Sequence, residues 1–143
     1  MHREILVIDD NPDIRILVSN ILKDQNFKVR TAANYDQAVN EINKKLPDLA
    51  IIDIKLDKTD KDGIDLLKLI TKKTKFTQII MISGHATVQI AIEAIRLGAY
   101  EFIEKPFSKE KILNYVNRAL ESSQLKKEKD IIENKLFHSF DLV

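Results

Sequence analysis

The chain has 143 residues, of which 44% are hydrophobic, and its 23 basic and 22 acidic side chains leave a formal net charge of +1. This length predicts one compact domain with its own core, and a near-neutral chain without a basic stripe is a poor candidate for direct nucleic-acid binding. The absence of cysteine excludes disulfides and thiolate metal sites, no apolar run is long enough to cross a membrane, and only three glycines leave no glycine-rich nucleotide loop.

Apolar runs alternate with segments of helical periodicity along the chain. The runs predict strands at 5–8, 28–32, 49–52, 79–82 and 100–104. Apolar residues recur at helical spacing at 14–21, 35–46, 64–70, 88–95 and 112–120. Local signals support these boundaries, since Asn11-Pro12 and Ser108 can begin helices, whereas Pro47 and Gly98 can end them.

Five repeats of strand and helix predict an α/β fold with right-handed βαβ connections. We expect a flavodoxin-like, doubly wound, five-stranded parallel sheet in the order 2-1-3-4-5, with helices on both faces. In this fold ligands bind at the carboxyl ends of the strands, near the switch between the first and third strands.

Polar residues stand at the carboxyl ends of four of the predicted strands. They are Asp9 and Asp10, Asp53, Ser83, and Lys105 followed by Pro106. Three carboxylates, a hydroxyl and an ammonium would therefore meet at one edge of the sheet. Such a set can hold a divalent cation and a phosphoryl group, with an aspartate as the nucleophile that accepts it. Each residue alone also fits an ordinary cap or turn, and only the combination favours a site.

This arrangement, from about Ile5 to about Leu120, resembles the receiver domain of two-component response regulators. The stretch from Ser83 to Phe107 is similar to the NtrC/NtrX branch of regulators that work with sigma-54 polymerase. The resemblance implies a cytoplasmic signalling switch, not an enzyme beyond slow phosphoryl transfer and hydrolysis on itself. A sensor histidine kinase would phosphorylate it, and an ATPase domain and a DNA-binding domain, both absent here, would follow.

The resemblance also assigns roles within the site. Asp53 would be the phosphoacceptor, and Mg²⁺ would be bound by Asp10, Asp53 and the Lys55 backbone carbonyl, with Asp9 acting through water. The phosphoryl group would contact Ser83, Gly84 and Lys105, and the Lys105–Pro106 peptide bond is expected to be cis.

Further roles concern what happens after phosphorylation. We expect Ser83 to move toward the phosphoryl group and Phe102, where many receivers carry tyrosine, to follow it as a switch. Lys55 and His85 are expected to tune the lifetime of the phosphoryl group, although ordinary surface roles fit them equally well.

A second apolar stripe on the predicted helix at 88–95 and beyond comprises Ile90, Ala94 and Leu97. We expect it to lie off the core and to form a homodimer surface together with the fifth strand and the last helix. Incidental surface positions are the alternative.

Two parts of the chain depart from the usual receiver pattern. Leu56-Asp57 replaces a common Met-Pro, and the loop from Asp53 to Gly63 is longer than usual, which puts its conformation in doubt. We divide the chain into a receiver at 1–121 and a helical linker at 122–143, in which broken heptads leave a coiled coil possible.

Two other functions remain open at this point. A phosphatase of the haloacid dehalogenase type shares the strand-end aspartate but normally has an acid two residues later, where this chain has Lys55. A pseudo-receiver that is never phosphorylated is the other alternative, and the complete acidic set argues against it.

Overall fold

A five-stranded parallel sheet organises the chain in the computed structural model, which describes residues 3–56, 62–85 and 87–141. The strands are β1 (Glu4–Ile8), β2 (Lys28–Ala32), β3 (Leu49–Asp53), β4 (Gln78–Ser83) and β5 (Glu101–Glu104). The helices are α1 (Pro12–Lys23), α2 (Tyr35–Lys44), α3 (Gly63–Lys73), α4 (Val88–Arg96) and α5 (Lys109–Asp141). The strand order is β2-β1-β3-β4-β5 and every pairing is parallel, which confirms the predicted fold.

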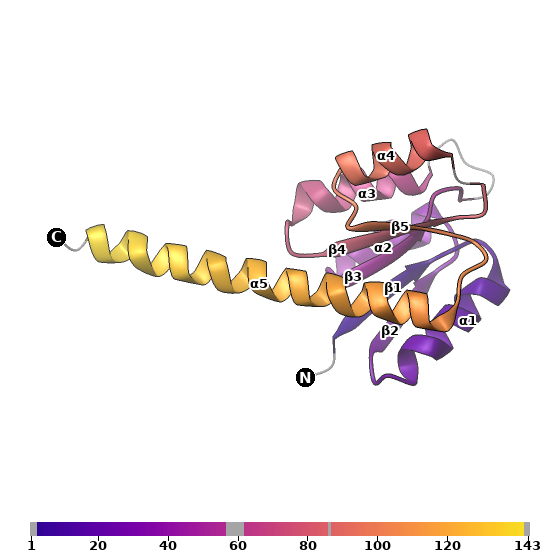
Figure 1. The fold of residues 1–143 in the computed structure, drawn as a ribbon, viewed down its shortest axis with the longest axis horizontal. Helices are drawn as coiled ribbons and strands as arrows, with labels where there is room; N and C mark the ends of the chain where they lie inside the picture. Colours follow the sequence, from indigo (N-terminus) through magenta and orange to yellow (C-terminus); the bar gives the residue numbers. More distant parts are fainter. Residues whose placement is uncertain (1–2, 57–61, 86, 142–143) are drawn as a thin grey trace.

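Helices cover both faces of this sheet, as Figure 1 shows. Successive side chains of a strand point to opposite faces. Ile5 and Val7 of β1 therefore pack with α1 and α5, whereas Leu6 and Ile8 pack with α2, α3 and α4. This double coverage explains why β1, β3 and β4 are buried along their whole length and read as continuous apolar runs.

Side-chain caps fix the helix ends, largely as the sequence predicts. The Asn11 side chain accepts hydrogen bonds from the first turn of α1, and Ser108 Oγ accepts one from the Lys111 backbone N–H (3.1 Å) at the start of α5. Gly98 follows the C-cap of α4 with a φ of +117°, a conformation that glycine adopts without strain.

The orientation of α4 differs from the prediction. Ala94 is fully buried, and Ile90 and Leu97 pack against the core, so these three residues do not form an exposed partner surface. The outward face instead carries Val88, Ile92 and Ile95, which are 76%, 59% and 45% exposed. Both stripes are apolar, so spacing alone could not decide between them. Ala94, with its small side chain, is the residue of α4 that is buried against the sheet.

Helix α5 runs unbroken past position 121, where we predicted that the receiver ends. Beyond that point the hydroxyl of the buried Ser123 donates to the Phe76 carbonyl (2.6 Å), and Asp130 pairs with Lys75 (2.9 Å). The helix then extends away from the sheet toward the C-terminus (Figure 1). The division at 121/122 stays a prediction. None of the described helices has the length and apolar character that a membrane span requires.

Candidate functional site

The register of the sheet brings the predicted site residues to one rim. Ile8 of β1 pairs with Ile52 of β3, so Asp9 and Asp53 both follow directly at their strand ends. Asp53 in turn pairs with Ile82 of β4, and Ser83 pairs with Glu104 of β5. The Lys105 backbone N–H donates to the Ser83 carbonyl (2.8 Å), which extends the β4–β5 pairing to the lysine itself.

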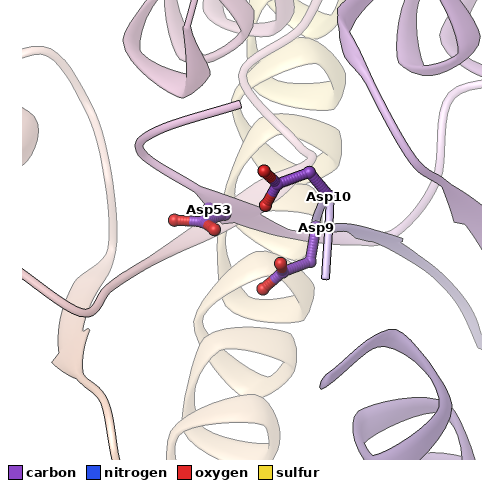
Figure 2. Close-up of side chains that lie close together, drawn as sticks. All are labelled: Asp9, Asp10 and Asp53. Atoms are coloured by element: carbon purple, nitrogen blue, oxygen red, sulfur yellow. The ribbon is translucent and has the colours of Figure 1, made fainter. Parts of the chain in front are cut away.

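The three carboxylates form one cluster. Asp9, Asp10 and Asp53 each offer an oxygen atom that lies within 4.8 Å of the other two. Figure 2 shows these side chains converging from the ends of two neighbouring strands. Asp9 and Asp53 are buried, whereas Asp10 is half-buried at the mouth of the cluster. Like charges this close repel one another and need a counter-charge.

Lys105 supplies a counter-charge from the end of β5. Its Nζ lies 3.0 Å from Asp9 Oδ2 and 3.2 Å from Asp53 Oδ2. Burial alone would lower the pKa of Lys105, but the close contact with the Asp9 carboxylate and the negative charges of Asp53 and Asp9 outweigh this effect and raise the pKa. The ammonium therefore stays protonated and bridges the two buried carboxylates.

The carboxylate of Asp53 is held from two sides. Its Oδ2 accepts a hydrogen bond from Lys105 Nζ (3.2 Å), and its Oδ1 accepts one from the Lys55 backbone N–H (3.3 Å). Burial raises the pKa of Asp53 to about 6, the charge of Asp9 adds to the rise, and Lys105 offsets part of it. Asp53 is thus ionised at neutral pH, but as the pH is lowered it becomes protonated at a higher pH than an exposed aspartate does.

The donor set fits a hard divalent cation. Magnesium prefers a few carboxylate oxygens together with water and phosphate oxygens. This cluster offers three carboxylates at the rim of the sheet. Asp9 Oδ1 accepts the Asn11 backbone N–H (2.9 Å), whereas the buried Oδ2 accepts no well-directed hydrogen bond from the described residues and meets only the Lys105 charge. An oxygen left in this state can serve a cation. The Lys55 carbonyl as a further ligand stays a prediction.

Ser83 and Gly84 border this cluster. The buried Ser83 Oγ accepts a hydrogen bond from the His85 backbone N–H (3.1 Å), and within the described parts of the chain its hydroxyl donates no hydrogen bond. A Cβ atom at Gly84 would lie 3.9 Å from Lys105 Cδ, which places Gly84 beside the lysine stem. The Lys105–Pro106 peptide bond is cis, as predicted. The side chains of Lys55 and His85 are exposed nearby in sequence, and their predicted roles are not tested by these contacts.

Phe102 lies outside the acidic cluster. It is half-buried on β5 and packs against the core cluster under α2, α3 and α4. A groove of about 490 Å³ runs between α4 and β5 beside it. Its lining comprises Ala91, Ile92, Ile95, Arg96, Glu101 and Phe102.

Sequence reasoning missed two residues that shape the site. Arg15 Nη1 donates to the Asp9 carbonyl (2.8 Å) and ties α1 to the acidic pair. Gly63 begins α3 against the backbone of Asp53 and Ile54. For Gly63, the available sequence signal was the Asp62-Gly63 pair just before a helical pattern. Nothing in the sequence pointed to Arg15. Asp57, which is part of the departure from the usual Met-Pro, and most of the lengthened loop lie outside the described residues.

Comparisons with known proteins agree with this geometry. The family model of the response regulator receiver domain matches residues 5–117. The nitrogen assimilation regulatory protein NtrX of Azorhizobium caulinodans is 41% identical over 128 residues, which are 90% of this chain and 28% of that protein. A putative NtrX-like response regulator of Rickettsia bellii is 38% identical over 140 residues, 98% of this chain and 29% of that protein.

A solved structure gives the same result at the level of the fold. The crystal structure of the receiver domain of NtrX from Brucella abortus is 45% identical, with a TM-score of 0.77, and the match covers 82% of this chain and 98% of that one. The chain spans less than a third of the length of the NtrX relatives named above. These matches, together with the acidic cluster and its lysine, show that the chain belongs to the response regulator receiver domain family and is similar to the receiver part of NtrX proteins.

Proposed function

We propose that this chain is a phosphorylation-driven switch that accepts a phosphoryl group from a sensor histidine kinase on Asp53. The observation that carries the proposal is the bridge from Lys105 to both Asp9 and Asp53, with a third carboxylate within 4.8 Å. An Asp53 oxygen attacks phosphorus, the P–N bond of the phosphohistidine breaks, and the imidazole nitrogen leaves with the electron pair. Membership in the receiver family speaks against the phosphatase alternative.

The neighbouring residues position and neutralise the groups in this transfer. Asp10, Asp53 and the Lys55 carbonyl would hold Mg²⁺ directly, and Asp9 would do so through water. When bound, the metal supplies positive charge that offsets the charge on the phosphoryl oxygens. Lys105 remains protonated and pairs with a phosphoryl oxygen, and the free proton of Ser83 can be donated to another.

Direct labelling tests the proposal. With Mg²⁺ and acetyl phosphate, we expect intact-mass spectrometry to show one phosphoryl group per chain, and none in Asp53→Asn. Asp36→Asn, which alters an exposed aspartate on α2, should be labelled like the unsubstituted chain. Because protonation of Asp53 removes the nucleophile, initial labelling rates should fall as the pH is lowered below neutral, and a higher Mg²⁺ concentration should move this fall to lower pH because the cation favours the ionised carboxylate.

Other outcomes of this assay would contradict the proposal. Labelling that persists in Asp53→Asn would place the acceptor elsewhere. Repeated turnover of a small phosphate ester would favour the phosphatase. An unsubstituted chain that responds neither to acetyl phosphate nor to Mg²⁺ with beryllofluoride would be a pseudo-receiver.

The structural effect of phosphorylation at Asp53 would be transmitted through Ser83 to Phe102 and α4. The product carries a charge of about −2, which draws the Ser83 hydroxyl inward and opens space that Phe102 can enter. In Ser83→Ala, phosphorylated to the same extent, we expect the NMR shift changes of α4 amides to shrink to less than half. Full-sized changes in that variant would disprove the coupling, and Ser122→Ala provides the matched control at a distant serine.

Lys55 and His85 would set the lifetime of the phosphoryl group. Both are exposed and each lies two residues after a site residue, where a side chain can obstruct or guide an attacking water. We expect Lys55→Ala and His85→Ala to change the first-order rate of phosphoryl loss severalfold, followed by mass spectrometry after removal of acetyl phosphate. Rates equal to that of the unsubstituted chain would assign both residues to the ordinary surface.

The partner surface moves to the outward side of α4. Val88, Ile92 and Ile95 leave apolar area exposed beside the groove, and Arg96 and Glu101 offer opposite charges that can pair across a two-fold axis. A homodimer through α4, β5 and α5 therefore uses these residues in place of Ile90, Ala94 and Leu97.

Charge substitution tests this dimer. Ile92→Glu would bury a carboxylate twice across a symmetric interface, so the phosphorylated variant should sediment as a monomer. The control is Ile16→Glu on α1, where the side chain is also 59% exposed but faces away from α4. Dimerisation that survives Ile92→Glu, or is lost equally in Ile16→Glu, would contradict this placement.

The proposed wider role rests on the resemblance to the NtrC/NtrX branch. The chain spans less than a third of the NtrX relatives, which leaves room in them for further domains, and we propose that its output is an ATPase domain and a DNA-binding domain of a cytoplasmic sigma-54-type activator.

A further inference from the structure

A chain of two hydrogen bonds links the start of α3 to the carboxylate of Asp53. The Gly63 backbone N–H donates to the Ile54 carbonyl (2.7 Å), and the Lys55 backbone N–H donates to Asp53 Oδ1 (3.3 Å). The Ile54 carbonyl and the Lys55 N–H belong to the same planar peptide group. Fixing the oxygen side of that group therefore fixes the direction of the N–H that holds Asp53.

Only a glycine fits at the start of this helix. A Cβ atom at position 63 would overlap the Asp53 carbonyl oxygen and would lie 2.9 Å from both Asp53 C and Ile54 Cα. These atoms belong to the buried end of β3, where the Ile54 N–H is also bonded to the Ile82 carbonyl (2.9 Å). The backbone there is held by β4 and cannot retreat, so a side chain would push α3 away.

The start of α3 is itself secured independently of the preceding loop. Asp62 Oδ1 accepts hydrogen bonds from the backbone N–H groups of Ile64 (3.0 Å) and Asp65 (3.2 Å). In return, Asp65 Oδ2 accepts the Asp62 N–H (3.2 Å) and completes a capping box. The capping box and the Gly63–Ile54 hydrogen bond thus fix Gly63 between α3 and the end of β3.

We propose that Gly63 is a positioning residue for the phosphoacceptor, acting through the Ile54–Lys55 peptide group. The expected metal ligand, the Lys55 carbonyl, lies in the next peptide group, so a displacement of the Ile54–Lys55 group would move the backbone that carries this ligand as well. Groups that orient ligands in this way typically contribute 10- to 100-fold to metal affinity. The inference rests on the proposed Mg²⁺ site of the receiver.

Magnesium affinity and one amide signal test the proposal without any phosphorylation. In Gly63→Ala, the dissociation constant for Mg²⁺ from NMR titration should rise about tenfold or more. The Lys55 amide proton in the Mg²⁺-free protein should also move upfield as its hydrogen bond to Asp53 is lost. The matched control is Gly98→Ala, which strains a positive-φ position after α4 and lowers thermal stability but should leave both readouts unchanged.

A second variant covers the case in which Gly63→Ala does not fold. Asp62→Ala removes the cap without adding an atom against Asp53, and a severalfold loss of Mg²⁺ affinity with a displaced Lys55 amide is expected. If Gly63→Ala folds, the inference is overturned when its Mg²⁺ dissociation constant lies within twofold of that of the unsubstituted chain. If Gly63→Ala does not fold, the same criterion applies to Asp62→Ala. If the unsubstituted chain bound no Mg²⁺, the proposed metal site itself would fail instead.

Discussion

The ion pairs of Lys105 with Asp9 and Asp53 are the interactions on which the site depends. The parallel sheet brings three carboxylates to one rim, and two of them are buried, so their mutual repulsion must be offset. One ammonium does this by lying within 3.2 Å of both buried carboxylates. A divalent cation bound in the cluster would compete with that ammonium for the carboxylate oxygens, and Lys105 would then be available to the proposed phosphoryl group.

Two different parts of the fold hold the two oxygens of Asp53. The lysine at the end of β5 holds Oδ2, and the peptide group after β3 holds Oδ1 through a bond that reaches back to α3. The proposed nucleophile is therefore oriented before any ligand arrives. Such preorganisation would let the proposed transfer proceed mainly by positioning and charge neutralisation.

The sequence was sufficient to predict where the strands end. It was not sufficient to predict how α4 is rotated or where the backbone of one segment closely approaches that of another. The continuous apolar runs located the strands, and the polar residue after each run located Asp9, Asp53, Ser83 and Lys105, because parallel strands share one carboxyl edge. The predicted rotation of α4 was wrong because two apolar stripes on one short helix give the same periodic signal. The role of Gly63 depends on a backbone approach between residues ten positions apart, and no periodicity encodes it.

The route taken by α5 connects two opposite edges of the sheet. The helix starts beside the rim that carries Lys105, and farther along it contacts the residues just before β4 through Ser123 with Phe76 and Asp130 with Lys75. Strands of five residues span roughly 17 Å, so these contacts lie about one strand length from Asp53, at the opposite edge of the sheet. The proposed phosphorylation of Asp53 would therefore reach this part of α5 as a displacement of the packed secondary structure between them.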